Sequence, residues 1–324
     1  MNTIVYVIGF ILNVAVMLYV MPKFIKKLKS LNINQVTSEY ALEDFKQKEK
    51  TPIMGGLLFV VIPIITFILI DINALSDRKL LFVMFSYVLY CLVGFLDDYT
   101  IVVKHNNEGL SQKSRLIMEL VFAAGLFFVF QDIIPQCVTI PFTTIGVQLP
   151  WFVFVPFMVL LYMAEANAVN FTDGMDGLCA GVSFIALIPM LVFTLIAKEY
   201  HVSLFICCIL GGLTGYLKFN FHPAKIFMGD SGSVALGALF AALGLMMDKT
   251  IALFFIGGTF VVEMFCVVLQ QLSVRLFHKR VFSYTPIHYA YVIKGYKEKN
   301  IVIGFYLFTL VLALIGLFIG LNTL

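Results

Sequence analysis

The sequence predicts an all-α polytopic membrane protein with about ten transmembrane helices, both termini outside and an active site at the cytoplasmic face. The first observation is composition: of the 324 residues, 61% are hydrophobic and 13% are charged. Soluble chains contain about 45–50% apolar and about 25% charged residues, so a core of this size cannot hide the surplus. The second observation is a series of apolar stretches long enough to span a bilayer, and the third is an uneven distribution of basic residues. This composition excludes a disordered chain, a coiled coil, a disulfide-rich secreted domain and a nucleic-acid-binding module.

A helix crosses the hydrocarbon core with about 17–25 mostly apolar residues. Stretches of this kind lie near residues 2–21, 53–70, 80–96, 116–131, 150–166, 178–197, 202–219, 232–247, 251–271 and 301–322. The first has no basic segment before it and no small-residue cleavage site after it, so we expect a retained span rather than a cleaved signal peptide. No internal repeat or flexible linker divides the chain, and residues 1–324 are expected to form a single integral-membrane domain.

Basic residues are concentrated in alternate loops. The loops 22–52, 97–115, 217–231 and 272–300 together hold eighteen of the 22 Lys and Arg residues, and the other four are Arg78, Lys79, Lys198 and Lys249. By the positive-inside rule, the basic side is cytoplasmic and both termini face outward. A cationic inner face suits anionic substrates or lipids.

The second span begins with a glycine-containing segment, TPIMGG at 51–56, which follows Lys46, Lys48 and Lys50. Neither a G-x-x-x-x-G-K-[ST] nor a G-x-G-x-x-G pattern accompanies it. The sequence therefore supports neither a P-loop nor a Rossmann cofactor site.

Asp97 and Asp98 end the third apolar span. Carboxylates beside a membrane-embedded helix are costly and are functional candidates by default. Because adjacent helical residues point about 100° apart, the pair is not expected to present both carboxylates directly to one ligand. A solvated helix end is the structural alternative.

An outer segment at 132–149, QDIIPQCVTIPFTTIGVQ, follows the fourth span. It is rich in β-branched residues and contains Pro135, Pro141 and Gly146, which predicts a small β-hairpin.

The fifth span leads into NAVNFTDGMDG at 167–177. Asp173 and Asp176 are three residues apart, and Gly174 and Gly177 allow a ligand to approach the backbone closely. The stretch lacks the alternating oxygen ligands and final Glu of an EF-hand, which argues against calcium. A polar helix cap is the structural alternative.

The eighth span is preceded by HPAKIFMGDSGS at 222–233, in which Asp230 stands just before Ser231-Gly232-Ser233. Asp230 could cap the following helix, or it could hold the Mg²⁺ that accompanies a phosphate at that helix N-terminus. Phe227, taken alone, is more often a core residue. His288, in TPIHY, is either a satisfied polar residue or a functional group.

All of these clusters fall at the predicted cytoplasmic ends of spans, which predicts one shared site. Together they resemble the phospho-N-acetylmuramoyl-pentapeptide transferase family, within the polyprenyl-phosphate N-acetylhexosamine-1-phosphate transferase superfamily. The matching segments follow the family's order over nearly the whole chain: TPIMGG, FLDDY, GLSQKSR, NAVNFTDGMDGL, FNFHPAKIFMGDSGS and KRVFSYTPIH.

The resemblance implies Mg²⁺-dependent transfer of phospho-MurNAc-pentapeptide from UDP-MurNAc-pentapeptide to undecaprenyl phosphate at a bacterial cell membrane, giving lipid I and UMP. It implies Asp97, Asp98, Asp230 and His288 as catalytic residues, with Asp230 as the magnesium ligand. Phe227 would stack on uracil, and the other substrate-binding positions are Lys48, Lys113, Asn170, Asp173, Asp176 and Asn220. A homodimer is implied by the same analogy.

One segment departs from the family pattern. The family usually has three consecutive histidines followed by Phe-Glu, whereas this chain has His288-Tyr289-Ala290-Tyr291-Val292. Any role of the other two histidines or of the Glu must be absent or must be supplied by different groups.

Three alternatives remain open. The first is a GlcNAc-1-phosphate transferase of the same superfamily. The second is a cation- or proton-coupled transporter, in which Glu119, Glu165 and Glu263 would be indispensable. The third is a catalytically silent protein that binds the lipid carrier. For a transferase, both direct attack by the lipid phosphate and a two-step route through a phospho-aspartate fit the sequence.

Overall fold

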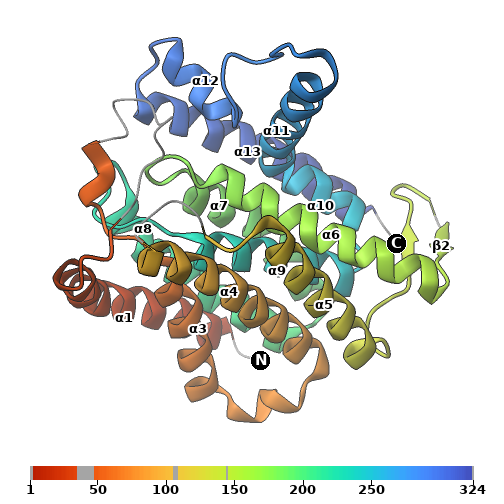
Figure 1. Cartoon of the computed structure of the whole chain (residues 1–324). Coiled ribbons are helices and arrows are strands. Elements are labelled where there is room, and N and C mark those ends of the chain that lie inside the picture. Colours follow the sequence, from red (N-terminus) through yellow and green to blue (C-terminus); the bar gives the residue numbers. More distant parts are fainter. Residues whose placement is uncertain (1–2, 35–46, 105–108, 144, 323–324) are drawn as a thin grey trace.

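The computed structural model describes residues 3–34, 47–104, 109–143 and 145–322, and it is mostly helical (Figure 1). The helices are α1 (Thr3–Ser30), η1 (Gln47–Lys50), α3 (Gly56–Ile70), η2 (Ile72–Ser76), α4 (Arg78–Lys104), α5 (Gln112–Phe130), α6 (Trp151–Thr172), α7 (Leu178–Ile196), α8 (Tyr200–Asn220), α9 (Asp230–Met246), α10 (Thr250–Ile256), α11 (Gly258–Phe277), α12 (Ile287–Ile293) and α13 (Glu298–Leu321). The two strands are β1 (Cys137–Thr139) and β2 (Gly146–Gln148).

Seven of these helices are long and apolar enough to cross a membrane: α1, α4, α6, α7, α8, α11 and α13. The helices at the other predicted spans are shorter or more charged. α3 has 15 residues, α9 has 17, and α5 carries Lys113, Arg115 and Glu119 near its start. The predicted mostly helical, polytopic membrane architecture is confirmed in this coarser form.

Two predicted spans end well before the observed helices do, and a third is divided into two helices. α1 continues through its basic segment to Ser30, and α4 continues past Asp97 and Asp98 to Lys104. Polar residues such as Lys are good helix formers, so a helix can extend beyond the apolar stretch. The predicted span 251–271 is two helices, α10 and α11, which are separated at Gly257.

α9 lies at the centre of the bundle and packs mainly against α4 and α6 (Figure 1). Its residues from Ser231 to Met246 are all buried. Small residues permit this close packing: a Cβ atom on Gly94 of α4 would lie 2.0 Å from the Asp230 carbonyl oxygen. The first turn of α9 is therefore fixed against α4 next to Asp97 and Asp98.

Large apolar side chains cover the outer surfaces of several helices. Exposed examples include Ile11 on α1, Val121 on α5, Phe265 on α11 and Leu314 on α13. Soluble monomers rarely expose apolar surface on this scale, so these faces are suited to lipid.

The β-hairpin predicted at 132–149 is confirmed. β1 pairs antiparallel with β2, and Val138 lies opposite Val147. The side chain of Asp248 accepts hydrogen bonds from the Thr139 hydroxyl and backbone amide, which fixes the hairpin to the bundle.

Candidate active site

The predicted polar clusters meet at one end of the bundle. The C-terminal ends of α4, α6 and α8 lie there with the N-terminal ends of α5, α9 and α13, as the hydrogen bonds between their side chains show. Side chains from segments far apart in the sequence are therefore brought together as one candidate site.

The N-terminus of α9 is capped by Asp98. The carboxylate oxygens of Asp98 accept hydrogen bonds from the backbone amides of Asp230 and Ser231, at 2.9 and 3.0 Å. Gly229, just before the helix, has a φ of +74°, a conformation that favours glycine. Because Asp98 occupies these amides, the carboxylate of Asp230 is not needed as a cap and faces the site instead.

The Asp230 carboxylate has two side-chain partners. Arg115 Nη1 donates to one oxygen at 2.7 Å, and Asn170 Nδ2 donates to the other at 2.8 Å. Arg115 Nε also donates to Glu119 at 3.2 Å. Among the described residues, the buried Nη2 of Arg115 has no hydrogen-bond partner. The guanidinium therefore has one N–H group to spare beside the carboxylates.

Lys113 lies two residues before Arg115, but its side chain is exposed. The structure thus brings Arg115 rather than Lys113 to Asp230. Asp97 is buried, accepts a hydrogen bond from the Leu110 amide at 3.0 Å and lies within the electrostatic range of Asp230. Asp97 and Asp98 have different partners, as the helical geometry predicts.

The charge of the site suits a divalent cation. The carboxylates of Asp97, Glu119 and Asp230 lie within electrostatic range of the Arg115 guanidinium, and those of Asp98 and Asp173 lie within range of Asp230. Burial, assisted by the charge of Asp230, raises the pKa of Asp173 to about 7. Carboxylate oxygens are the ligands that Mg²⁺ prefers, so an additional cation held by Asp230 would relieve this surplus of negative charge.

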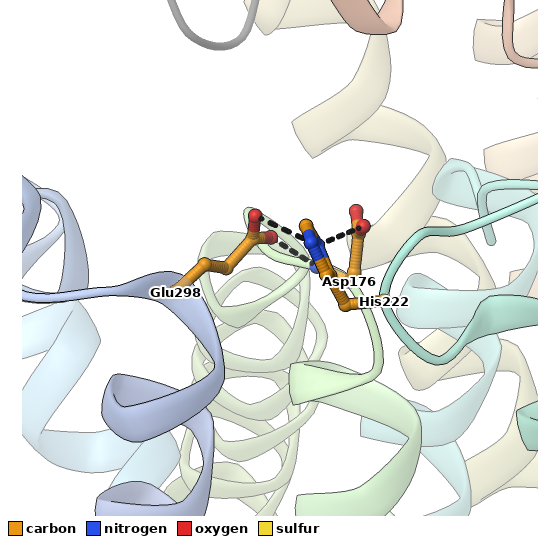
Figure 2. A group of neighbouring side chains, drawn as sticks. All are labelled: Asp176, His222 and Glu298. Atoms are coloured by element: carbon orange, nitrogen blue, oxygen red, sulfur yellow. Dashed lines mark hydrogen bonds and ion pairs between the residues drawn. The ribbon is translucent and has the colours of Figure 1, made fainter.

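A second cluster joins the loop Asp173–Gly177 to distant segments (Figure 2). Asp176 accepts from Lys48 Nζ at 2.6 Å through one oxygen, and from the Ala224 amide at 3.0 Å through the other. His222 and Glu298 complete the cluster. Asn220 ties the same loop to the α8–α9 connection, because it accepts from the Gly177 amide and donates to the Ile226 carbonyl.

Phe227 is held by its backbone against TPIMGG. Its amide donates to the Pro52 carbonyl, and its carbonyl accepts from the Gly55 amide, both at 2.8 Å. The ring is only partly buried, and its centroid lies 5.9 Å from Lys48 Nζ. Phe227 therefore lies at the edge of the site rather than in the buried core.

His288 is fully buried and lies against Gly174. Its Nδ1 is 3.0 Å from Glu263 Oε1, and its Nε2 has no hydrogen-bond partner among the described residues. The next residue, Tyr289, donates its hydroxyl to the Gly174 carbonyl at 3.0 Å. Two side chains of helix α12, His288 and Tyr289, thus pack against the Asp173–Gly177 loop.

Sequence reasoning missed Arg115, His222 and Glu298 as members of the site. Arg115 stands in GLSQKSR and His222 in FNFHPAKIFMGDSGS, so both were within segments that the resemblance singled out. Glu298 lies beyond every such segment, and its only signal is the isolated acid in the basic stretch 294–299.

The chain is similar in sequence to known glycosyl transferases. The sequence profile of glycosyl transferase family 4 matches residues 80–248, the part of the chain that contains Asp97, Arg115 and Asp230. Phospho-N-acetylmuramoyl-pentapeptide-transferases from three strains of Staphylococcus aureus are each 35% identical to the chain over 317 residues. These alignments cover 96% of the chain and 98% of each relative.

Proposed function

The chain belongs to the phospho-N-acetylmuramoyl-pentapeptide transferase family, and from this premise we propose that it transfers phospho-MurNAc-pentapeptide from UDP-MurNAc-pentapeptide to undecaprenyl phosphate. The products are lipid I and UMP, in peptidoglycan synthesis. The observation that carries the proposal is the position of Asp230: its backbone is fixed by Asp98, and its carboxylate faces Arg115 and Asn170. Donors and carboxylates are thus fixed in advance where charge must be neutralised, beside the Asp173–Gly177 loop, which we assign to the nucleoside of the donor.

Mg²⁺ is the proposed cofactor, with Asp230 as its ligand. When bound, it would neutralise the charge of the donor diphosphate. The chain's own residues supply the rest. Arg115 has a spare N–H group for a phosphate oxygen, and Asn170 orients the Asp230 carboxylate.

Direct attack by the lipid phosphate is the favoured route. A phosphate monoester has a second pKa of about 6, so about 90% of the acceptor is already dianionic in the cytoplasm and no strong base is required. An acceptor oxygen bonds to the sugar-bearing phosphorus while the bond to the bridging oxygen breaks, and UMP leaves with that oxygen. Asp97 orients the acceptor. Asp98 is a poor nucleophile for a two-step route, because both of its oxygens accept backbone amides.

The assay that tests this function follows UMP release from purified protein with UDP-MurNAc-pentapeptide, undecaprenyl phosphate and Mg²⁺. Release that depends on all three is expected. UDP-GlcNAc in place of the donor tests the relative that transfers GlcNAc-1-phosphate. Release with UDP-GlcNAc alone, or no release with either donor, would contradict the proposal.

We also propose ten membrane spans, with the site at the cytoplasmic face of a bacterial plasma membrane. Single cysteines at Lys27 and Lys279, in a background without the native cysteines, are expected to be protected from an impermeant thiol reagent added outside intact cells. Cysteines at Ser76 and Lys198 are expected to react. All four side chains are exposed on the protein. The opposite labelling pattern would put the site outside, where no UDP-sugar is available.

Phe227→Ala is expected to weaken donor binding, because the partly buried ring is available to stack on uracil. Stacking on an aromatic ring is worth about 1–3 kcal/mol per base in nucleic-acid sites, so the donor KM should rise roughly 5–150-fold. Phe227→Tyr and Phe227→Trp should retain much of the affinity. If Phe227→Ala instead lowers the melting temperature steeply and leaves the donor KM unchanged, the ring is a packing residue.

A further inference from the structure

Four side chains from four separate segments meet beside the Asp173–Gly177 loop. Figure 2 shows three of them: Asp176 from the loop, His222 from the α8–α9 connection and Glu298 from the first turn of α13. The fourth, Lys48, comes from η1. Neither His222 nor Glu298 has a place in the function proposed above.

Glu298 is the residue that joins these segments. Its Oε1 accepts hydrogen bonds from Lys48 Nζ at 2.7 Å and from the Asp176 backbone amide at 2.8 Å. Its Oε2 lies 3.3 Å from His222 Nδ1. The Glu298 side chain is 14% exposed and that of Asp176 only 1%. Charge-assisted hydrogen bonds in such a shielded position are among the stronger ones in proteins.

The cluster is better suited to holding Lys48 than to holding a metal ion. The ligand atoms of Asp176, His222 and Glu298 lie within 4.8 Å of one another, a spacing that would admit a divalent cation. The ammonium group of Lys48, however, is bonded to both carboxylates. The chain therefore supplies the cation itself.

We infer that Glu298 is a positioning residue for the donor side of the site. It holds Lys48 and the Asp176 loop together next to the Phe227 ring, which lies 5.9 Å from Lys48 Nζ. Fixing these groups before the donor arrives lowers the entropic cost of binding it. The inference rests on the proposed function, because it takes the Phe227 side of the site as the donor side.

Glu298 stands apart from the groups proposed to carry the chemistry. Its contacts among the described residues are with Lys48, Asp176 and His222, whereas Asp230 is held by Arg115 and Asn170. Loss of Glu298 should therefore weaken donor binding and leave the transfer step largely intact.

The test is Glu298→Gln, which keeps the shape of the side chain and removes its charge. The donor KM is expected to rise about tenfold or more, while kcat and the acceptor KM stay within about twofold. Glu199→Gln is the matched control. Glu199 is also partly buried, with a side chain 19% exposed, and it pairs with Lys79 at the opposite end of the bundle. That variant should leave all three kinetic constants unchanged.

A double-mutant cycle tests whether Glu298 acts through Lys48. If it does, adding Glu298→Gln to Lys48→Gln should raise the donor KM by less than about twofold further. Any of three results would overturn the inference. The donor KM of Glu298→Gln is unchanged, its kcat falls by as large a factor as its donor KM rises, or its effect on the donor KM adds fully to that of Lys48→Gln. If Glu298→Gln does not fold, Glu298→Asp replaces it, because its side chain is one methylene group shorter and keeps the charge. Glu298→Asp must then raise the donor KM and leave kcat and the acceptor KM unchanged.

The two proposals fail in different ways. An active wild-type enzyme with normal donor binding by Glu298→Gln overturns only the positioning role. A folded wild-type protein that releases no UMP overturns the proposed function, and calorimetric titration with UMP then decides the role of Glu298. Equal UMP affinity in wild type and Glu298→Gln overturns the positioning role, and about tenfold weaker binding by the variant supports it.

Discussion

Replacement of Asp230 by alanine is expected to abolish Mg²⁺-dependent UMP release and to leave the protein folded. The carboxylate is the one at the start of α9 that faces the site, and its loss removes the proposed ligand of the cation. A cation that stabilises transition-state charge is worth several kcal/mol, so kcat should fall by about 10³-fold or more. UMP release and melting temperature, measured on the same preparation, check the expectation.

Folding should survive because the Asp230 side chain does not cap α9. Asp98 binds the backbone amides of residues 230 and 231, and this contact is independent of the side chain at position 230. The Asp230 side chain is also 22% exposed, so alanine leaves no sealed cavity. Asp248→Ala is the control: it removes a carboxylate just beyond the other end of α9, where Asp248 holds the β1–β2 hairpin, and should leave turnover unchanged. Normal UMP release by a well-folded Asp230→Ala protein would rule out the proposed metal ligand.

The helices of the fold could be predicted from apolar stretches, because a bilayer imposes length and hydrophobicity on every segment that crosses it. The residues at which these helices end could not be predicted in the same way. Asp97 and Asp98 mark the end of an apolar stretch, yet α4 continues to Lys104, since helical propensity does not stop where hydrophobicity does. The break between α10 and α11 falls at the Gly257-Gly258 pair. Such a pair marks turns, but the apolar residues on both sides of it read as one continuous span.

The members of the site could be predicted better than their roles. The resemblance assigns Asp98 to the chemistry, and the structure adds that its carboxylate accepts two backbone amides of α9, a contact between residues more than 130 positions apart. Local sequence carries no signal for such a contact. Glu298 was missed for the same reason, since its partner Lys48 lies 250 positions earlier in the chain.

The acidic residues inside the helices separate the transferase from the transporter alternative. Glu119 binds Arg115 and Asn167, and Glu263 pairs with His288, so both support residues of the site. Glu165 is different: one of its oxygens has no partner among the described residues. A continuous ion path would require linked carboxylates across the bundle, whereas two of these three acids belong to the polar cluster at one end.

The second large effect is expected from Arg115. Arg115→Met leaves the buried Glu119 and the partly buried Asp230 without their cationic partner. Removing one member of a buried ion pair costs about 3–5 kcal/mol, so the melting temperature should fall clearly. Turnover should fall about 10²-fold or more, because the loss of one charge-stabilising donor in an active site has an effect of that size. Arg115→Lys keeps the charge and should retain part of both properties.

Lys113→Met is the matched control. It also tests whether Lys113, which the resemblance indicates, or Arg115, which the structure places at Asp230, acts in the site. Two residues along a helix turn the side chain by about 200°, so only one of Lys113 and Arg115 can face Asp230. The resemblance pointed to Lys113, whereas in the structure Lys113 is exposed and Arg115 donates to Asp230 at 2.7 Å. Lys113→Met should therefore change stability by no more than about 0.5 kcal/mol and leave most of the activity. If Lys113→Met lowers both the melting temperature and the turnover more than Arg115→Met does, Lys113 is the residue that binds the phosphate, and the Arg115–Asp230 pair has no part in turnover.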